Sequence, residues 1–307
     1  MKKPSKIAKQ ETAPDLHAQL GLLPGQSLEL LKALHILTRD GKINQDSRRK
    51  LKQVRHLIQL IQPLLQELAT AHPDRHTQTV VDHGAGKSYL GFMLYDAYAA
   101  SQVPKGDAVA TQNKGSHQLS VHGVENREEL VQRSVELAKA CGFTGMHFHA
   151  LDTQDALTSD EFPEHIDLVT ALHACNTATD DAITFGLHRK CDAFALVPCC
   201  QAEVAAAMRL GKQGMLSQTP LSELWRHPIH TRELGSQLTN VLRCLRLEAS
   251  GYDVTVTELV GWEHAMKNEL ILARRTGKPR HSAAKRQREI LATFGLELLA
   301  DRFAAVV

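Results

Sequence analysis

The sequence predicts an α/β fold in which a doubly wound, mainly parallel sheet follows a helical N-terminal segment. Residues 80–91 contain an apolar run, two glycines at alternate positions and then a helical pattern, which indicates a strand, a tight turn and a helix. After Pro73, apolar runs and helical patterns alternate, as they do in chains that form parallel sheets. Before Pro73, apolar residues recur at helical spacing, so a helical part precedes the sheet.

The expected organisation, in chain order, is a disordered basic tail over residues 1–14, a helical N-terminal extension over residues 15–75 and a Rossmann-like domain over residues 76–307. The helical spacing of the extension is carried by Leu51, Val54, Leu57, Ile58, Ile61, Leu64, Leu65 and Leu68. Asp46 or Ser47 is a suitable N-cap for this helix. Because proline removes a backbone donor, Pro63 predicts a kink or a break.

Composition limits the class of protein. The chain has 307 residues and a formal net charge of +2, and no apolar run reaches membrane-spanning length. The first ten residues are basic and lack an apolar core, so we expect a soluble, cytoplasmic protein. The six cysteines form no Cys-x-x-Cys pair, which argues against a zinc ribbon and a disulfide framework.

Basic residues concentrate in two segments, Arg48 to Arg55 and Arg274 to Arg288. Such segments can contact nucleic acid, although a charged run more often forms a solvated face.

The expected strands lie near 79–83, 119–124, 146–150, 166–171, 193–197, 252–260 and 270–274. Helices are expected near 87–100 and 128–140, after Thr179 or Asp180 as N-cap, and from His230 to Gly251. Residues 101–118 indicate a long surface loop, and residues 201–228 are irregular enough to form a lid.

The glycine turn restricts the ligand. A P-loop would need glycine at Val81, and the dinucleotide fingerprint would need it at Tyr89. Asp82 before the turn would repel a polyanion and suits a ligand that carries an ammonium and a sulfonium group. S-adenosyl-L-methionine is such a ligand, and glycines such as Gly84 and Gly86 allow it to approach the backbone.

The pattern Asp82-x-Gly84-x-Gly86 resembles motif I of the class I S-adenosylmethionine-dependent methyltransferases. Further matches are Leu-His-Ala-Cys at 172–175 with Thr179-Asp180, Pro-Cys-Cys at 198–200 and the segment from Glu263 to Asn268. Together these motifs resemble a branch of that family related to tRNA 2′-O-methyltransferases and to methyltransferase-like proteins, over roughly residues 45–275. The resemblance implies a Rossmann-like seven-stranded class I methyltransferase sheet closed by an antiparallel hairpin. His83 departs from the branch pattern, which usually has Asp or Phe-Cys there.

The expected cofactor-binding residues are Asp82, Gly84, Ala85, Gly86, Leu90, Glu125, Asp152, Thr153 and His173. Glu125 directly follows the second strand and is the expected acceptor for the ribose hydroxyls; Asp107 has the usual spacing but follows no apolar run. The resemblance suggests that Asp152 accepts from the adenine amino group. Alternatively, Asp152 or Thr153 only caps the following turn.

The expected catalytic residues are His173, Cys199, Cys200, Lys267 and Asn268. His173 is the best general base if the acceptor atom is oxygen. Cys199 and Cys200, with Cys175, are interpreted as a wall of the acceptor site; zinc and inert packing are the alternatives, and no metal is predicted because His-x-Cys and Cys-Cys are not usual zinc pairs. Lys267 and Asn268 lie in the connection between the last two strands.

The sequence therefore predicts methyl transfer from S-adenosyl-L-methionine by direct displacement. RNA is the favoured acceptor, from the family relationship and the two basic segments. Proteins and small molecules stay open, as does a non-catalytic module that binds cofactor or RNA, which the intact Glu125 and motif glycines argue against.

Overall fold

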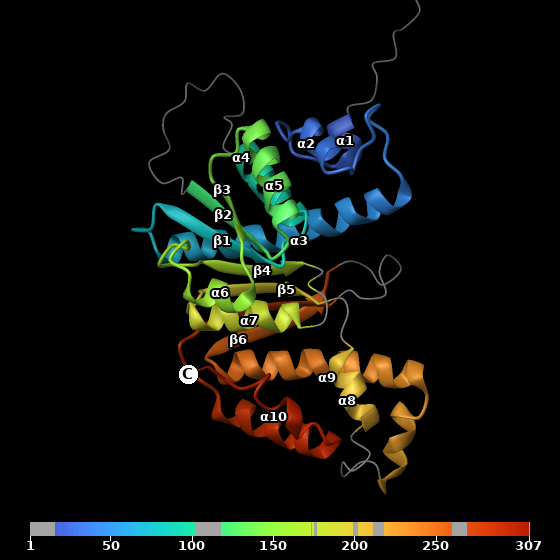
Figure 1. Ribbon diagram of the computed structural model, residues 1–307. Helices are drawn as coiled ribbons and strands as arrows, with labels where there is room; N and C mark the ends of the chain where they lie inside the picture. Colours follow the sequence, from blue (N-terminus) through green and yellow to red (C-terminus); the bar gives the residue numbers. More distant parts are fainter. Residues whose placement is uncertain are drawn as a thin grey trace, which may run out of the picture.

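The computed structural model describes residues 16–101, 118–172, 174, 177–198, 202–210, 218–259 and 269–306. Its centre is a seven-stranded sheet with the order β3-β2-β1-β4-β5-β7-β6 (Figure 1). The strands are β1 (Thr77–His83), β2 (Gln118–Glu125), β3 (Met146–Ala150), β4 (Leu168–Leu172), β5 (Ala193–Val197), β6 (Tyr252–Glu258) and β7 (Glu269–Arg275). The first five are parallel, whereas β7 pairs antiparallel with β5 and with β6. This is the seven-stranded Rossmann-like sheet, closed by an antiparallel hairpin, that the sequence predicted.

Helices cover both faces of the sheet. The face with α3 (Gln45–Ala71), α4 (Tyr89–Ser101) and α5 (Glu128–Cys141) buries Val80 and Val121, and the face with α6 (Thr153–Thr158), α7 (Ala178–His188) and α9 (Pro228–Ala249) buries Val81 and Val124 (Figure 1). Successive side chains of a strand point to opposite faces, so neighbouring valines serve different cores.

The N-terminal helices α1 (Leu16–Leu20), α2 (Leu28–Ala33) and α3 contribute buried residues to the core on the face of the sheet that α4 and α5 cover. The Asp96 carboxylate of α4 accepts hydrogen bonds from Gln26 Nε2 at 3.2 Å and from the Ser27 N–H at 3.1 Å. This contact fastens the connection before α2 to the sheet-packed helix α4.

Helix α3 differs from the prediction at two points. Its N-cap is Asn44, whose side chain accepts from the Ser47 N–H at 2.8 Å, so Asp46 and Ser47 lie inside the first turn. The helix also continues through Pro63, and the predicted break is wrong. Leu57, Ile61, Leu64 and Leu65 are buried around Pro63, and this packing outweighs the single backbone bond that proline removes.

Further along the chain, α7 takes Thr177 as its N-cap in place of Thr179 or Asp180. Residues 203–210 form α8 (Glu203–Leu210), whose Val204 and Met208 are buried, so this part of the expected lid is a packed helix. After a 3-10 turn, η2 (Pro220–Trp225), α9 packs on α8 and on α10 (His281–Phe294). Helix α10 was not predicted, and a further 3-10 turn, η3 (Glu297–Leu299), follows it.

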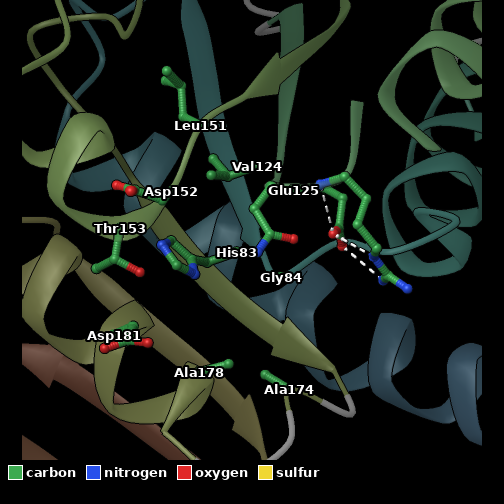
Figure 2. A pocket seen from close by; sticks show the side chains of 12 residues that line it. His83, Gly84, Val124, Glu125, Leu151, Asp152, Thr153, Ala174, Ala178 and Asp181 are labelled. Atoms are coloured by element: carbon green, nitrogen blue, oxygen red, sulfur yellow. Dashed lines mark hydrogen bonds and ion pairs between the residues drawn. The ribbon is translucent and has the colours of Figure 1, made fainter. Parts of the chain in front are cut away.

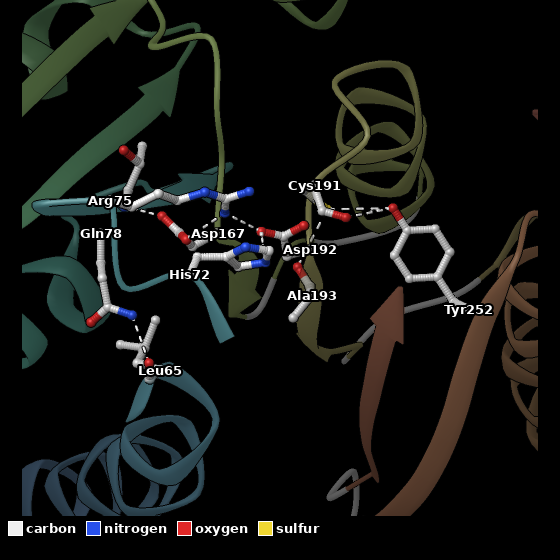
Figure 3. Close-up of polar contacts among 10 residues, drawn as sticks. Leu65, His72, Arg75, Gln78, Asp167, Cys191, Asp192, Ala193 and Tyr252 are labelled. Carbon is white, nitrogen blue, oxygen red and sulfur yellow. Dashed lines mark hydrogen bonds and ion pairs between the residues drawn. The ribbon is translucent and has the colours of Figure 1, made fainter. Parts of the chain in front are cut away.

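Ion pairs join the segments that precede the central strands. Arg75, just before β1, contacts Asp167 at 3.1 Å and also pairs with Asp192, which precedes β5 (Figure 3). The Tyr252 hydroxyl donates to the Cys191 carbonyl at 2.7 Å on the same edge. A ligand site of this sheet is therefore expected at the opposite edge, where the parallel strands end.

The loop expected at 101–118 lies almost wholly outside the described residues, as does the expected disordered tail. Among the residues described, no helix combines the length and apolar character needed to cross a membrane.

Candidate functional site

The turn between β1 and α4 has the conformation that its glycines allow. Gly84 and Gly86 have φ of +69° and +58°, values that side chains with a Cβ adopt rarely. The Ala85 N–H donates to the Val124 carbonyl at 2.9 Å, which fixes the turn against the end of β2. Ser88 also has positive φ, +49°, where a third glycine would be unstrained.

A cavity of about 390 Å³ lies beside this turn at the carboxyl ends of β1, β2 and β3 (Figure 2). Its lining residues are His83, Gly84, Val124, Glu125, Asn126, Arg127, Leu151, Asp152, Thr153, Ala174, Ala178 and Asp181. The neighbours of β1 in the sheet lead the chain in opposite directions, to β2 and β3 on one side and to β4 on the other. Doubly wound sheets bind ligands at such a switch point.

Glu125 is the most strongly bonded acid of the cavity. Its carboxylate accepts from the Gly86 N–H at 2.9 Å. It also accepts from Arg127 Nε at 2.8 Å (Figure 2). Burial alone would raise its pKa, but the hydrogen bonds and charge of Arg127, with the Gly86 N–H, outweigh burial and hold the pKa below its usual range. The side chain is therefore an ionised acceptor on the cavity wall.

Asp152 and Thr153 line the cavity at the start of α6. The Asp152 side chain accepts from the Asp155 N–H at 2.9 Å and is the N-cap of this helix. Its predicted contact with adenine stays a prediction. Asp181 of α7 also lines the cavity, and burial raises its pKa above the usual range.

Four other expected cofactor residues are not part of the cavity lining. The Asp82 carboxyl is buried and accepts from the Thr170 hydroxyl at 2.9 Å, and burial raises its pKa to about 7. Leu90 is 2% exposed and belongs to the core under α4. Ala85 and Gly86 support the turn through their backbone bonds. None of these four is among the residues that line the cavity.

Among the cavity residues that sequence reasoning missed, three are ionisable: Arg127, Asp181 and His83. The His83 ring is 5% exposed, and neither of its nitrogens has a hydrogen-bond partner among the described residues. Burial lowers its pKa to about 4, against the opposing charge of Glu125. The departure of His83 from the branch pattern was the available signal.

All the expected catalytic residues, His173, Cys199, Cys200, Lys267 and Asn268, fall outside the described residues, as does Cys175. Their strands are placed: Leu172 pairs with Val197, so β4 and β5 end side by side, and Ala174 lines the cavity. Within the described part of the chain, no group of three or more His, Cys, Asp or Glu side chains could hold a metal ion.

Comparison with known proteins identifies the family. A model described as a methyltransferase domain matches residues 49–207, which is more than half of the chain. The chain belongs to this methyltransferase family. No curated protein matches the sequence.

Solved structures of other proteins match the chain at low sequence identity. The SAH-bound methyltransferase PaMTH1 of Podospora anserina is 11% identical, with 89% of this chain and 99% of that chain covered and a TM-score of 0.42. A putative caffeoyl-CoA O-methyltransferase from Staphylococcus aureus is 9% identical, with coverages of 85% and 96% and a TM-score of 0.43. The fibrillarin pre-rRNA processing protein of Methanococcus jannaschii is 9% identical, with coverages of 67% and 70% and a TM-score of 0.37.

The protein is thus a methyltransferase, and S-adenosyl-L-methionine is the cofactor that its sequence predicts. The cavity fits the nucleoside part of this cofactor. It combines an ionised acid for vicinal hydroxyls, Glu125, with apolar walls for a planar ring, Leu151 and Ala178, and with the unpartnered imidazole of His83.

Proposed function

We propose that this methyltransferase binds the adenosyl part of S-adenosyl-L-methionine in the cavity beside the glycine turn and methylates RNA. The observation that carries the proposal is the position of Glu125. Its carboxylate lies on the cavity wall and is bonded to the Gly86 N–H of the turn that would admit the ligand. Acid and turn are therefore held in one geometry, as joint recognition of a ribose requires.

Each cavity wall has a task in this proposal. Glu125 accepts the ribose hydroxyls, Gly84 leaves room for close approach, and Asp152 with Thr153 faces the base. The bound cofactor supplies an electrophilic methyl group. The protein orients the acceptor in line with that group and excludes water, which can supply much of the rate acceleration without a covalent nucleophile.

The acceptor side of the proposal lies at the ends of β4 and β5. His173 accepts the proton of an attacking hydroxyl, and Cys199 and Cys200 form the wall against which the acceptor rests. Lys267 and Asn268 directly precede β7 in the chain, and β7 lies next to β5 in the sheet. We also propose that the protein is related to the tRNA 2′-O-methyltransferase branch and that the acceptor atom is an oxygen.

The first basic segment lies close to the glycine turn. Arg48, Arg49, Lys50 and Lys52 are exposed at the start of α3. The Lys50 ammonium stands 6.0 Å from the ring centre of Tyr89, the first residue of α4. Because α4 begins directly after the turn, these charges could hold RNA phosphates next to the cofactor cavity.

The second basic segment is largely paired with acids of the protein itself. Arg274 contacts Glu67 at 2.7 Å, Arg280 contacts Asp253 at 2.7 Å, and Arg286 contacts Glu248 at 2.9 Å. These charges are partly compensated in the folded chain. We therefore assign the RNA contacts to the start of α3 and interpret α10 as a structural helix with a solvated charged face.

The test measures release of S-adenosylhomocysteine by the full-length protein with cell RNA, protein extract or small metabolites as acceptor. RNA binding should weaken steeply with salt. The logarithm of the binding constant should fall with the logarithm of the salt concentration by a slope of about 0.7 to 0.9 for each phosphate neutralised. The variant R48E/R49E/K50E should lose RNA affinity and keep cofactor affinity. Its matched control is K285E/R286E/R288E on α10, which makes the same change in charge and should keep RNA affinity.

Turnover on a protein or a metabolite that is independent of salt and unaltered by R48E/R49E/K50E would reject the RNA acceptor. It would leave methyl transfer in place.

A further inference from the structure

His83 is a buried polar side chain on the wall of the cavity. It is the last residue of β1, its ring is 5% exposed, and both ring nitrogens lack a hydrogen-bond partner among the described residues. Buried polar groups in native proteins are nearly always bonded. A buried polar group on a cavity wall that lacks a hydrogen bond indicates that a ligand in the cavity supplies one.

The imidazole faces the part of the cavity between β3 and α7. Figure 2 shows the His83 ring directed toward Asp152 and Thr153, with Asp181 farther along the same wall. Its other side packs against Phe185 of α7, with 5.8 Å between the ring centres. Phe185 is itself fully buried, so the ring of His83 is held from behind by the core.

The polar groups of the cavity divide into two sets. Glu125, bonded to Gly86 and Arg127, stands on the wall next to the glycine turn. His83 and Asp152 stand toward α6 and α7, with the apolar side chains of Leu151 and Ala178 beside them. An acid suits hydroxyl donors, whereas apolar walls with a hydrogen-bonding ring suit a planar heterocycle.

The protonation of His83 agrees with a neutral partner. Burial lowers its pKa to about 4, so the ring is uncharged near neutral pH and has one N–H donor and one acceptor nitrogen. A purine presents ring nitrogens that accept a hydrogen bond. A neutral imidazole can donate to one of them without placing a charge in the apolar part of the cavity.

We propose that His83 is a specificity-determining residue that donates a hydrogen bond to a ring nitrogen of the cofactor's adenine. The inference rests on the proposed binding of S-adenosyl-L-methionine in this cavity. It adds a base-reading contact from β1 to the site built by the ends of β2 and β3.

The test is a double-mutant cycle between the ligand and the protein. S-adenosylhomocysteine and its 1-deaza, 3-deaza and 7-deaza adenine analogues are titrated into the wild type and into His83→Phe by calorimetry. In the wild type, one analogue should bind about tenfold more weakly than the parent compound, as expected for a lost hydrogen bond inside a cavity. His83→Phe should bind the parent compound about tenfold more weakly than the wild type does. The variant should bind that analogue and the parent compound with equal affinity.

The matched control is His147→Phe on β3, which replaces an exposed histidine outside the cavity lining and should bind all four ligands like the wild type. Each deaza analogue loses some affinity relative to S-adenosylhomocysteine. If these losses are the same in the wild type and in His83→Phe, His83 does not contact the base and the inference is overturned. Binding of S-adenosylhomocysteine by the wild type would then leave the proposed function standing. A wild type that does not bind this compound overturns both.

A second measurement uses the wild type and so does not depend on how a variant folds. In protein labelled with ¹⁵N at histidine, saturation with S-adenosylhomocysteine should shift the ring nitrogen signals of His83 and leave those of His122 unchanged. His122 is buried as well, but its ring nitrogens are bonded to Ser120 and His149. Unchanged His83 signals at saturation would overturn the inference.

Discussion

The carboxylate of Glu125 accepts a hydrogen bond of 2.9 Å from the backbone N–H of Gly86, which lies 39 positions earlier in the chain. The same carboxylate is paired with Arg127 at 2.8 Å. The end of β2 and the glycine turn after β1 are thus one bonded unit. A change in the acid alters the turn, and a change in the turn alters the position of the acid.

Replacement of Glu125 tests the ribose contact. Glu125→Ala should weaken binding of S-adenosylhomocysteine by at least about tenfold, because one charged hydrogen bond contributes roughly 1.5 to 3 kcal/mol. Glu125→Gln keeps an acceptor for the Gly86 N–H and should lose less. Calorimetry measures both, with Glu129→Ala in the first turn of α5 as the control. Equal affinity for Glu125→Ala and the wild type would remove Glu125 from the site.

Two glycines with the same backbone conformation separate strain from ligand contact. Gly84 has φ of +69° and lines the cavity, whereas Gly142 ends α5 with φ of +70° and open space around it. A side chain in this conformation costs about 1 to 2 kcal/mol at either position. Gly84→Val and Gly142→Val should therefore lose similar stability in denaturant titrations, and only Gly84→Val should lose cofactor binding. Cofactor binding by Gly84→Val at wild-type affinity would contradict the proposed approach of the ligand.

The buried histidines predict loss of stability in acid. Burial, with the charges of His147 and His149, lowers the pKa of His122 to about 3, while an unfolded histidine titrates near 6.5. Between these values the unfolded chain binds more protons, so the free energy of unfolding falls as the pH is lowered from 6.5 toward 3. One such group contributes at most about 1.4 kcal/mol per pH unit.

The variant His122→Phe should show a shallower dependence of unfolding free energy on pH between 4 and 6.5, measured by denaturant titration. Above pH 7 the difference between the variant and the wild type should not change with pH. The same slope in both proteins would show that His122 is protonated in the folded state.

A buried ion pair between α7 and α9 predicts strong coupling. Arg243 donates to Asp180 through Nε at 2.9 Å and through a terminal nitrogen at 2.6 Å, and both side chains are almost fully buried. Arg243→Met should destabilise the protein by about 3 to 5 kcal/mol, because it leaves an unpaired buried carboxylate. The double variant Arg243→Met/Asp180→Leu should regain much of this loss. Additive effects in a double-mutant cycle would refute the coupling.

The sequence predicted the sheet well because each strand has a local signature. The glycine turn, the run before Glu125 and the strand at Ala193–Val197 are visible from composition and spacing. Helix α10 was missed because its buried face is formed by Ala283, Gln287 and Leu291, a small, a polar and a single large apolar residue within a strongly basic segment.

Positions along a strand could be predicted more readily than directions of side chains. Asp82 and His83 are neighbours on β1, so their side chains point to opposite faces. The structure directs His83 to the cavity and Asp82 to Thr170. Which face opens onto a cavity depends on how α6 and α7 pack. This packing cannot be predicted from the sequence of a single strand.

Titration of the wild type with S-adenosylhomocysteine, ATP and NAD tests the central claim most directly. Calorimetry should show micromolar binding of one S-adenosylhomocysteine per chain, strongly reduced in Glu125→Ala, and no comparable binding of ATP or NAD. Tight binding of ATP or NAD without binding of S-adenosylhomocysteine would contradict the cofactor assignment.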